Sequence, residues 1–231
     1  MATGLAMGQT VLVQRKFDPE DWLRLVDTYK VTSTFSAPTP IRMVCNLPED
    51  VKKKYDVSSM RRMIANAAPW SFTLKQMYLE YFPSISLFEV YGSTELGVNC
   101  VLKPDDQLRK PGSCGKAVRN VETRVVNDYM QDVAVGEVGE IVHRSPHLML
   151  GYFHDDERTK ASFEGDWFHS GDLGLIDEEG YITVVDRKKD MIKSGGENVA
   201  SREVEEMIYR LPQVSEVAVI GLPDPKWVEA V

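Results

Sequence analysis

The sequence has few cysteines and no long apolar run, and each shortage excludes a class of protein. Its three cysteines, Cys45, Cys100 and Cys114, follow no CxxC or other metal-ligand spacing, and an odd number does not suit a paired disulfide framework. We therefore expect free thiols, a reducing compartment and a cytoplasmic location. No apolar stretch approaches the length of a membrane span. The opening residues also lack the basic and apolar regions of a secretory signal.

Positive charge is scarce as well. The chain has 27 Lys and Arg residues against 35 Asp and Glu residues, which gives a net charge of −8 and a pI near 5.1. Because nucleic-acid phosphates are bound through an excess of Lys and Arg, this balance argues against nucleic acid as the main partner. It still permits a local basic patch around a small anion. The 43% hydrophobic and 27% charged composition of the 231 residues is typical of a globular protein with a core.

Several widespread catalytic motifs are missing. The sequence contains no GxxxxGK[ST], GxGxxG, HExxH or GxSxG. His143 and His147 are close in sequence, but Pro146 argues against a helix that would align them on a metal, and we expect exposed histidines on strands. The HSGD segment at 169–172 does not indicate a hydrolase triad, because such triads are assembled from distant segments.

The first part of the chain alternates helices and apolar strands. The clearest helix has Asp18 as its N-cap and Pro19 at its first position, and a later helix has Ser71 as its cap. Such alternation predicts a parallel α/β sheet through about residue 100. The expected strands cover residues 9–14, 31–36 and 86–92, and the expected helices cover residues 17–31, a short stretch after Pro38, and 71–84.

Short alternating strands with glycine-rich turns take over from Gly115 to Asp186, which predicts a small antiparallel barrel or meander. A helix over 201–212 and a strand over 214–222 then indicate the start of a new α+β unit. The expected fold class is therefore α/β plus β. The expected divisions are a partial α/β subdomain over 1–110, a β-barrel-like subdomain over 111–186, and a hinge with the start of an α+β domain over 187–231.

The stretch EVYGSTE, residues 89–95, is the first of three that suit a charged ligand. A buried strand ends here in a turn, which is where open α/β sheets bind ligands. Gly92 allows close approach of the backbone, Tyr91 offers a flat face, and the Glu95 carboxylate suits a magnesium ion. The alternative is a tight turn capped by Thr94.

The other two stretches carry a carboxylate and a guanidinium. In GDWFHSGDLG, residues 165–174, Asp172 could accept two hydrogen bonds from a sugar diol; the alternative is an Asp-Gly hairpin turn. In DRKKDMIKSGGENVASREVEE, residues 186–206, the forked head of Arg187 suits phosphate or ribose oxygens. The alternative for this charged run is a solvated linker.

Taken together, these stretches resemble the adenylate-forming superfamily, which contains acyl-CoA synthetases, peptide-synthetase adenylation domains and luciferases. YGSTE, GEIVHRSPHLMLGYF, WFHSGDLG and the 186–206 stretch look like its successive motifs, and PTPIRMV and NAAPW are similar to earlier ones. SGGENV resembles the form found in acyl- and aryl-CoA synthetases. The resemblance covers essentially the whole chain. It implies the C-terminal part of the large domain followed by the start of the small one.

The resemblance also implies a reaction, its cofactors and the residues that serve it. Such a ligase activates a carboxylic acid, here expected to be a fatty acid, with ATP and Mg²⁺ and transfers the acyl group to CoA. Thr94 would contact phosphate, Glu95 would hold the metal, and Lys189 would be the hinge of the small domain. Asp172 and Arg187 would bind the ribose. The residues expected to line the nucleotide and CoA sites are Ala68, Pro69, Glu89, Tyr91, Gly92, Ser93, Thr94, Asp172, Arg187, Ser194, Gly195 and Gly196.

The sequence departs from the family in ways that affect these expectations. Trp70 is bulky beside the expected acyl pocket, and Asn66 and Ala67 stand where glycines are common. The family's phosphate loop and its late lysine have no match, so we expect a chain truncated at both ends that is inactive alone. Two alternatives stay open: a non-catalytic nucleotide-binding or interaction module of this fold, and an aryl-acid or peptide-synthetase adenylation enzyme.

Overall fold

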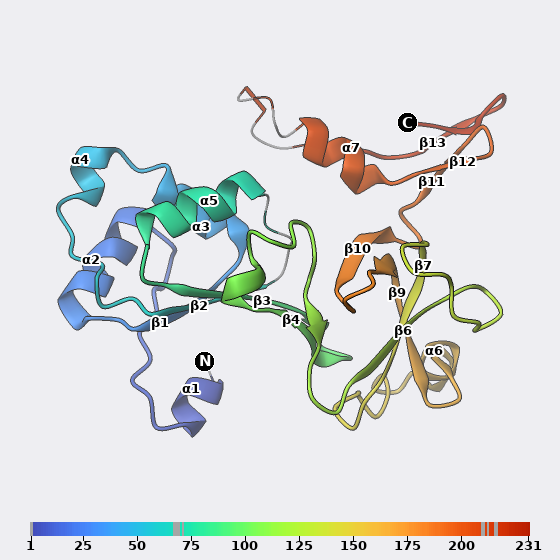
Figure 1. Cartoon of the computed structure of the whole chain (residues 1–231), viewed down its shortest axis with the longest axis horizontal. Coiled ribbons are helices and arrows are strands. Elements are labelled where there is room, and N and C mark those ends of the chain that lie inside the picture. Colours follow the sequence, from blue (N-terminus) through green and yellow to red (C-terminus); the bar gives the residue numbers. More distant parts are fainter. Residues whose placement is uncertain (1, 67–69, 71, 209–210, 212, 215–216) are drawn as a thin grey trace. The chain divides into compact units, whose positions relative to one another are not determined.

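The computed structural model describes residues 2–66, 70, 72–208, 211, 213–214 and 217–231 (Figure 1). It divides into two compact units, one formed by residues 1–68 and 73–87 and the other by residues 69–72 and 88–231. Helices and strands alternate in the first unit, whereas strands dominate the second. No helix within the described ranges combines the length and the apolar character needed to cross a bilayer.

Helix α2 (Pro19–Tyr29) of the first unit starts as the sequence predicts. The Asp18 carboxylate caps it by accepting a hydrogen bond of 2.7 Å from the backbone N–H of Asp21. Leu23 and Val26 are buried on one face of this helix. The remaining helices that begin before residue 85 are α1 (Ala2–Ala6), α3 (Pro38–Cys45), α4 (Glu49–Lys52) and α5 (Phe72–Tyr81).

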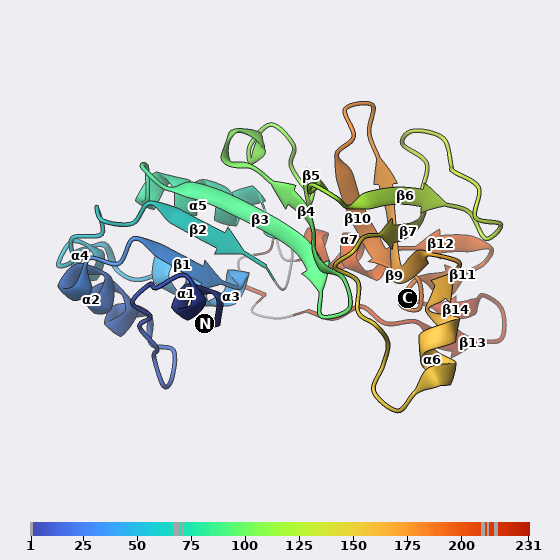
Figure 2. The ribbon, with the colours of Figure 1, turned by 90° about the horizontal axis from the view of Figure 1, so that it is seen from below.

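The strands of the first unit begin a parallel sheet. Strand β1 (Ser33–Ser36) runs parallel to β2 (Arg62–Ala65), and Figure 2 shows the two side by side. Strand β3 (Ser86–Ser93) begins where the backbone N–H of Ser86 donates to the carbonyl of Arg61 at 2.8 Å. These pairings confirm the parallel α/β start of the chain.

Three strand predictions need correction. Strand β4 (Gly97–Leu102) runs antiparallel to β3, so the parallel arrangement does not extend through residue 100. Residues 9–14 form no strand, because an apolar alternation becomes a strand only where a neighbour supplies ladder hydrogen bonds. Residues 217–221 are likewise irregular, and β13 (Leu222–Asp224) starts only at the end of the predicted strand.

An antiparallel sheet forms the centre of the second unit and confirms the predicted change of strand type. Its order is β10-β9-β7-β6, with β8 attached to β9. Cys100, Val125, Ile141 and Ile182 form its buried core, and all three cysteines are free thiols. Its strands are β6 (Glu122–Val126), β7 (Gly139–Arg144), β8 (Phe163–Glu164), β9 (Trp167–Ile176) and β10 (Ile182–Arg187), and α6 (Asp156–Ala161) precedes β8. The 3-10 helix η1 (Pro104–Asp106) and strand β5 (Lys116–Ala117), which pairs with β4, come before them.

The C-terminal segment adds a small sheet and one helix to the second unit. The strand order is β12-β11-β14-β13, and the first helical residue, Ser201, donates through its hydroxyl to Asp186 at the end of β10 over 3.1 Å. The helix that the sequence predicts here is present. The elements are β11 (Ile192–Ser194), β12 (Glu197–Val199), α7 (Ser201–Ile208), β13, and β14 (Val228–Ala230).

Candidate active site

Side chains from three strands form one hydrogen-bonded cluster. The Tyr91 hydroxyl donates to Asp172 Oδ2 at 2.6 Å, and Arg187 Nε lies 3.1 Å from Asp172 Oδ1. Arg187 faces Asp172 because the antiparallel register of β9 and β10 pairs these two residues. The fold therefore brings together one residue from each of the three stretches that the sequence singled out.

Ser170 holds the backbone at Asp172 in place. Ser170 accepts a hydrogen bond of 3.0 Å from the Asp172 backbone and donates one of 2.6 Å to the carbonyl of Ile141. The Asp172 side chain is 12% exposed and that of Arg187 59%. Burial, followed by the negative charge of Asp172, raises the pKa of Tyr91, so its hydroxyl stays a hydrogen-bond donor. The hairpin-turn alternative for Asp172 is wrong, because β9 continues through it to Ile176.

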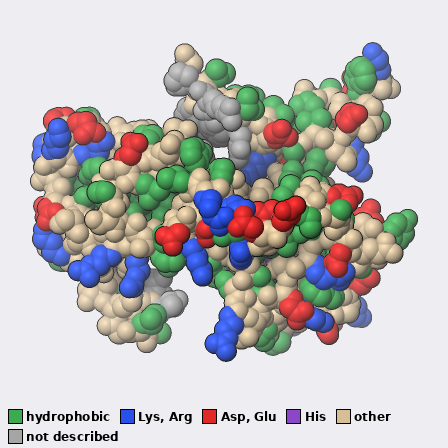
Figure 3. All heavy atoms as spheres, in the orientation of Figure 1, with side chains coloured by type: hydrophobic (Ala, Val, Ile, Leu, Met, Phe, Trp, Pro, Cys, Tyr) green, Lys and Arg blue, Asp and Glu red, His purple; other side chains and the backbone are tan. Residues whose placement is uncertain are grey.

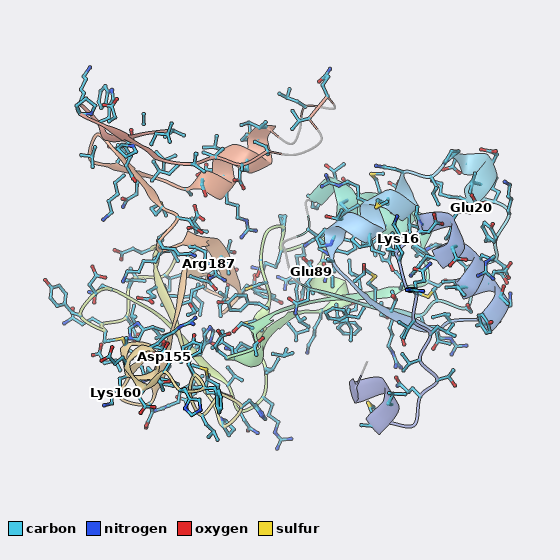
Figure 4. All side chains as sticks on the ribbon, turned by 180° about the vertical axis from the view of Figure 1, so that it is seen from behind. Lys16, Glu20, Glu89, Asp155, Lys160 and Arg187 are labelled. Atoms are coloured by element: carbon cyan, nitrogen blue, oxygen red, sulfur yellow. The ribbon has the colours of Figure 1, made fainter. Side chains whose placement is uncertain are left out.

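A basic hollow of about 300 Å³ adjoins this cluster, lined by Gly171, Arg187, Lys188 and Lys189. Figure 4 labels Arg187 at the end of β10, where the chain leaves for its C-terminal strands. The Lys188 backbone donates to Gly171 at 2.8 Å, and its ammonium lies 3.0 Å from Glu140. The turn that follows contains the exposed Lys189. Lysines and arginine around one hollow suit an anionic ligand, even though acidic and basic side chains are interspersed on the face in Figure 3.

The YGSTE stretch covers the end of β3 and the start of the turn that joins it to β4. Ser93 donates to Glu95 Oε2 at 2.8 Å, and Tyr152 donates to Glu95 Oε1 at 3.2 Å. These hydrogen bonds, that of Ser93 first, lower the pKa of Glu95 and keep its carboxylate charged. Thr94 lies exposed in the same turn.

Glu95 fits a magnesium ion of the kind that completes its shell with substrate phosphates and water. In the described part of the chain, no group of three or more His, Cys, Asp or Glu side chains could hold a metal alone. Mg²⁺ commonly binds through one or two carboxylates together with phosphate oxygens. A single oriented carboxylate in an exposed turn meets that requirement.

Gly92 and Glu89 lie on β3 beside this turn. A Cβ on Gly92 would lie 1.9 Å from the carbonyl oxygen of Gly97, so backbone packing alone requires glycine there. The sequence had suggested ligand approach as the reason. Glu89 is buried and lies opposite Leu102 in the register of β3 and β4 (Figure 4).

The predicted CoA-channel residues form a different turn. Gly195 and Gly196, with φ values of 60° and 92°, follow Ser194 and connect β11 to β12, as the positive-φ turns of two-residue hairpins do. A Cβ on Gly195 would lie 2.6 Å from the Trp227 ring. Within the described ranges, no hydrogen bond or ion pair of the structure joins this turn to the Asp172 cluster. Ala67, Ala68, Pro69 and Ser71 lie outside the described residues.

His143 is a correction to the sequence analysis, since it is fully buried rather than exposed. Its ring lies 5.8 Å from that of Tyr91 between centroids, and its Nδ1 is 3.0 Å from the Thr123 hydroxyl. The period of two along β7 places His143 on the same face as the core residue Ile141, and that signal could have predicted its burial. His147 is exposed, as expected.

Burial of His143 predicts a pH-dependent loss of stability. Desolvation lowers its pKa to about 4 in the folded protein, against 6.5 as its ordinary value. Between these two values the His143 ring is protonated in the unfolded chain and neutral in the folded chain. Stability should fall by about 3 kcal/mol as the pH drops from 6.5 to 4, with no further loss from this group below that range. Urea unfolding at several pH values should show this slope, His143→Leu should flatten it, and His147→Gln should not.

Comparisons with known proteins show which family the chain resembles. Residues 1–153 match a protein family described as AMP-binding enzyme. The chain is 38% identical to a feruloyl-CoA synthase of Amycolatopsis sp over 97% of its own length and 45% of that protein. It is 34% identical to 4-coumarate–CoA ligase 1 of Petroselinum crispum, over 98% of this chain and 42% of the relative. The chain thus spans less than half the length of these curated relatives.

Solved structures show the same similarity. The amide bond synthetase McbA from Marinactinospora thermotolerans matches with a TM-score of 0.89 at 33% identity, over 98% of this chain and 46% of that structure. O-succinylbenzoate coenzyme A synthetase from Bacillus subtilis, in complex with ATP and magnesium ion, matches with a TM-score of 0.86 at 30% identity, over 99% of this chain and 46% of that structure.

Proposed function

Because the chain belongs to the AMP-binding enzyme family, we propose that it carries part of the active site of an AMP-forming CoA ligase. In this reaction the carboxylate of an organic acid attacks the α-phosphate of ATP and releases pyrophosphate. The thiol of CoA then takes the acyl group and releases AMP. The observation that carries the proposal is the pairing of Asp172 with Arg187 beside Tyr91.

The residues present have distinct roles in this proposal. Asp172 accepts hydrogen bonds from the ribose hydroxyls, Arg187 donates to ribose or phosphate oxygens, and Tyr91 packs against the adenine. Glu95 would hold Mg²⁺, which when bound neutralises phosphate charge, and Thr94 donates to phosphate. The turn at Lys189 is the hinge about which the C-terminal segment rotates.

The acid and its acceptor form a further part of the proposal. Relatives are named for ferulate, 4-coumarate and indoleacetate, so we extend the substrate class to aryl acids, and the fatty acid predicted from the sequence stays a prediction. An amine acceptor is a second candidate, supported by the similarity to an amide bond synthetase. A panel of fatty and aryl acids, offered with CoA or with an amine to the parent enzyme, distinguishes these choices.

We expect the 231-residue chain alone to bind nucleotide without catalysing adenylation. It contains no match to the family's phosphate loop or late lysine, and each lost electrostatic contact costs about 10²–10³ in rate. Calorimetry should detect binding of a non-hydrolysable acyl-adenylate mimic, whereas ATP–pyrophosphate exchange with fatty or aryl acids should stay at background.

Two other outcomes would contradict these statements separately. Robust pyrophosphate exchange by the isolated chain would disprove the prediction that it does not catalyse adenylation alone. The ligase assignment would then remain intact. Failure to bind either AMP or the acyl-adenylate mimic, in a chain shown to be folded by circular dichroism, would contradict the ligase assignment and favour an interaction module.

A further inference from the structure

The Glu95 carboxylate is held by hydroxyl groups from two directions. Ser93 lies in its own hairpin and donates to Oε2. Tyr152 lies 57 residues further along the chain and donates to Oε1. A carboxylate has about four acceptor sites, so these two hydroxyl contacts do not use all of them. The carboxylate is thus oriented without being saturated.

Tyr152 is itself fixed by the start of α6. Its backbone N–H donates to the Thr159 hydroxyl at 2.8 Å, and that hydroxyl donates to the carbonyl of Asp155 at 2.9 Å. The guanidinium carbon of Arg158 lies 3.8 Å from the centroid of the Tyr152 ring. Asp155, labelled in Figure 4, caps the helix by accepting from the Arg158 N–H at 3.0 Å. Helix α6 therefore holds both the backbone and the ring of Tyr152.

The loop before Tyr152 also follows the Glu95 turn closely. The Met149 N–H donates to the carbonyl of Glu95 at 2.8 Å. A Cβ on Gly151 would lie 3.0 Å from the Thr159 side chain, so the loop packs tightly on α6. The backbone of Glu95 and its side chain are thus both contacted by residues 149–152.

We propose that Tyr152 is a positioning residue that orients the Glu95 carboxylate toward a divalent cation, and that Arg158 holds the tyrosine ring for this purpose. The proposal rests on the proposed function, because it assumes that Glu95 contacts the metal that accompanies ATP. It gives a role to Tyr152, which lies in the GEIVHRSPHLMLGYF motif without one, and to Arg158, which lies outside the motifs.

A positioning role and a purely structural role predict different measurements. Tyr152 is half-buried, so removal of its hydroxyl should change global stability little. Loss of a residue that orients a metal ligand typically lowers metal affinity about 10–100-fold. Metal-dependent binding should therefore weaken in Tyr152→Phe while metal-independent binding stays the same.

The test titrates Mg²⁺ into the chain at a fixed ATP concentration and follows binding by calorimetry. Tyr152→Phe should raise the half-saturating Mg²⁺ concentration at least about tenfold, and its affinity for AMP in EDTA should equal that of the wild type. Arg158→Gln should raise the Mg²⁺ requirement about two- to fivefold, since a cation over an aromatic ring contributes modestly at an exposed site. Tyr129→Phe, which removes a hydroxyl from a ring 83% exposed, is the matched control and should behave as wild type.

Each remaining outcome decides between the proposals. An unchanged Mg²⁺ requirement in Tyr152→Phe overturns the positioning role and leaves the proposed function standing. A parallel loss of AMP binding in EDTA also overturns it, because the tyrosine would then support the fold rather than the metal ligand. If the folded wild-type chain binds AMP but shows no Mg²⁺-dependent ATP binding, this inference fails and the proposed function stands. If it binds neither, the proposed function fails as well.

Discussion

Asp172→Ala should weaken AMP binding by about 100-fold or more. A hydrogen bond to a charged group contributes about 1.5–3 kcal/mol, and a carboxylate that accepts both ribose hydroxyls makes two. The substitution also leaves the Tyr91 hydroxyl and the Arg187 guanidinium without the acceptor they share in the structure. Calorimetric titration of AMP into wild type and variant measures the loss directly.

Two further variants make this prediction specific. Asp172→Asn keeps the shape but loses the charge, and it should bind AMP with intermediate affinity. Asp166→Ala removes an exposed carboxylate just before β9 and should bind like the wild type. Wild-type affinity for AMP in folded Asp172→Ala would disprove the assignment of the ribose site to this cluster.

Gly92→Ala should destabilise the second unit by about 4 kcal/mol, which is at the upper end for single substitutions. The added Cβ would lie 1.9 Å from the carbonyl oxygen of Gly97 and 3.1 Å from the Cα of Val98. Both are backbone atoms in the paired strand, so no side-chain rotation relieves the overlap. Urea unfolding followed by circular dichroism measures the change in the free energy of unfolding.

The control for this substitution is another glycine with open space around it. Gly136 has a φ of 81° and no atom within 4 Å of an added Cβ, so Gly136→Ala should cost only about 1 kcal/mol, the price of a positive φ. Equal losses in the two variants would show that the β3–β4 hairpin shifts to accept a methyl group, contrary to the packing described here.

Much of the fold could be predicted because its signals are local. The Asp18 cap and the adjacent Pro19 define the start of α2 within a few residues. The alternation in β6 and β7 likewise indicates strands without knowledge of their neighbours. The wrong predictions concern which strands pair with each other. Residues 9–14 have the apolar alternation of a strand and form none, and β4 turns back against β3 where a parallel continuation was expected.

The candidate site shows the same limit. Motifs predicted Tyr91, Glu95, Asp172 and Arg187 as site residues, since each of them stands at a defined position of its motif. Tyr152 lies in a quoted motif but was given no role, and Arg158 lies in none. His143 was expected at the surface, whereas it is buried beside Tyr91. A tyrosine and an arginine are too common to be singled out without knowing what they contact.

By itself the sequence indicated the family, several of the helices and strands, and the polar side chains that we propose for a nucleotide site, because caps, periodicity and motif spacing act over neighbouring residues. Only the tertiary structure decided that Asp172 receives Tyr91 and Arg187 together and that α6 supports Glu95 through Tyr152. Those contacts join segments tens of residues apart, and their formation depends on strand register and packing rather than on any local preference.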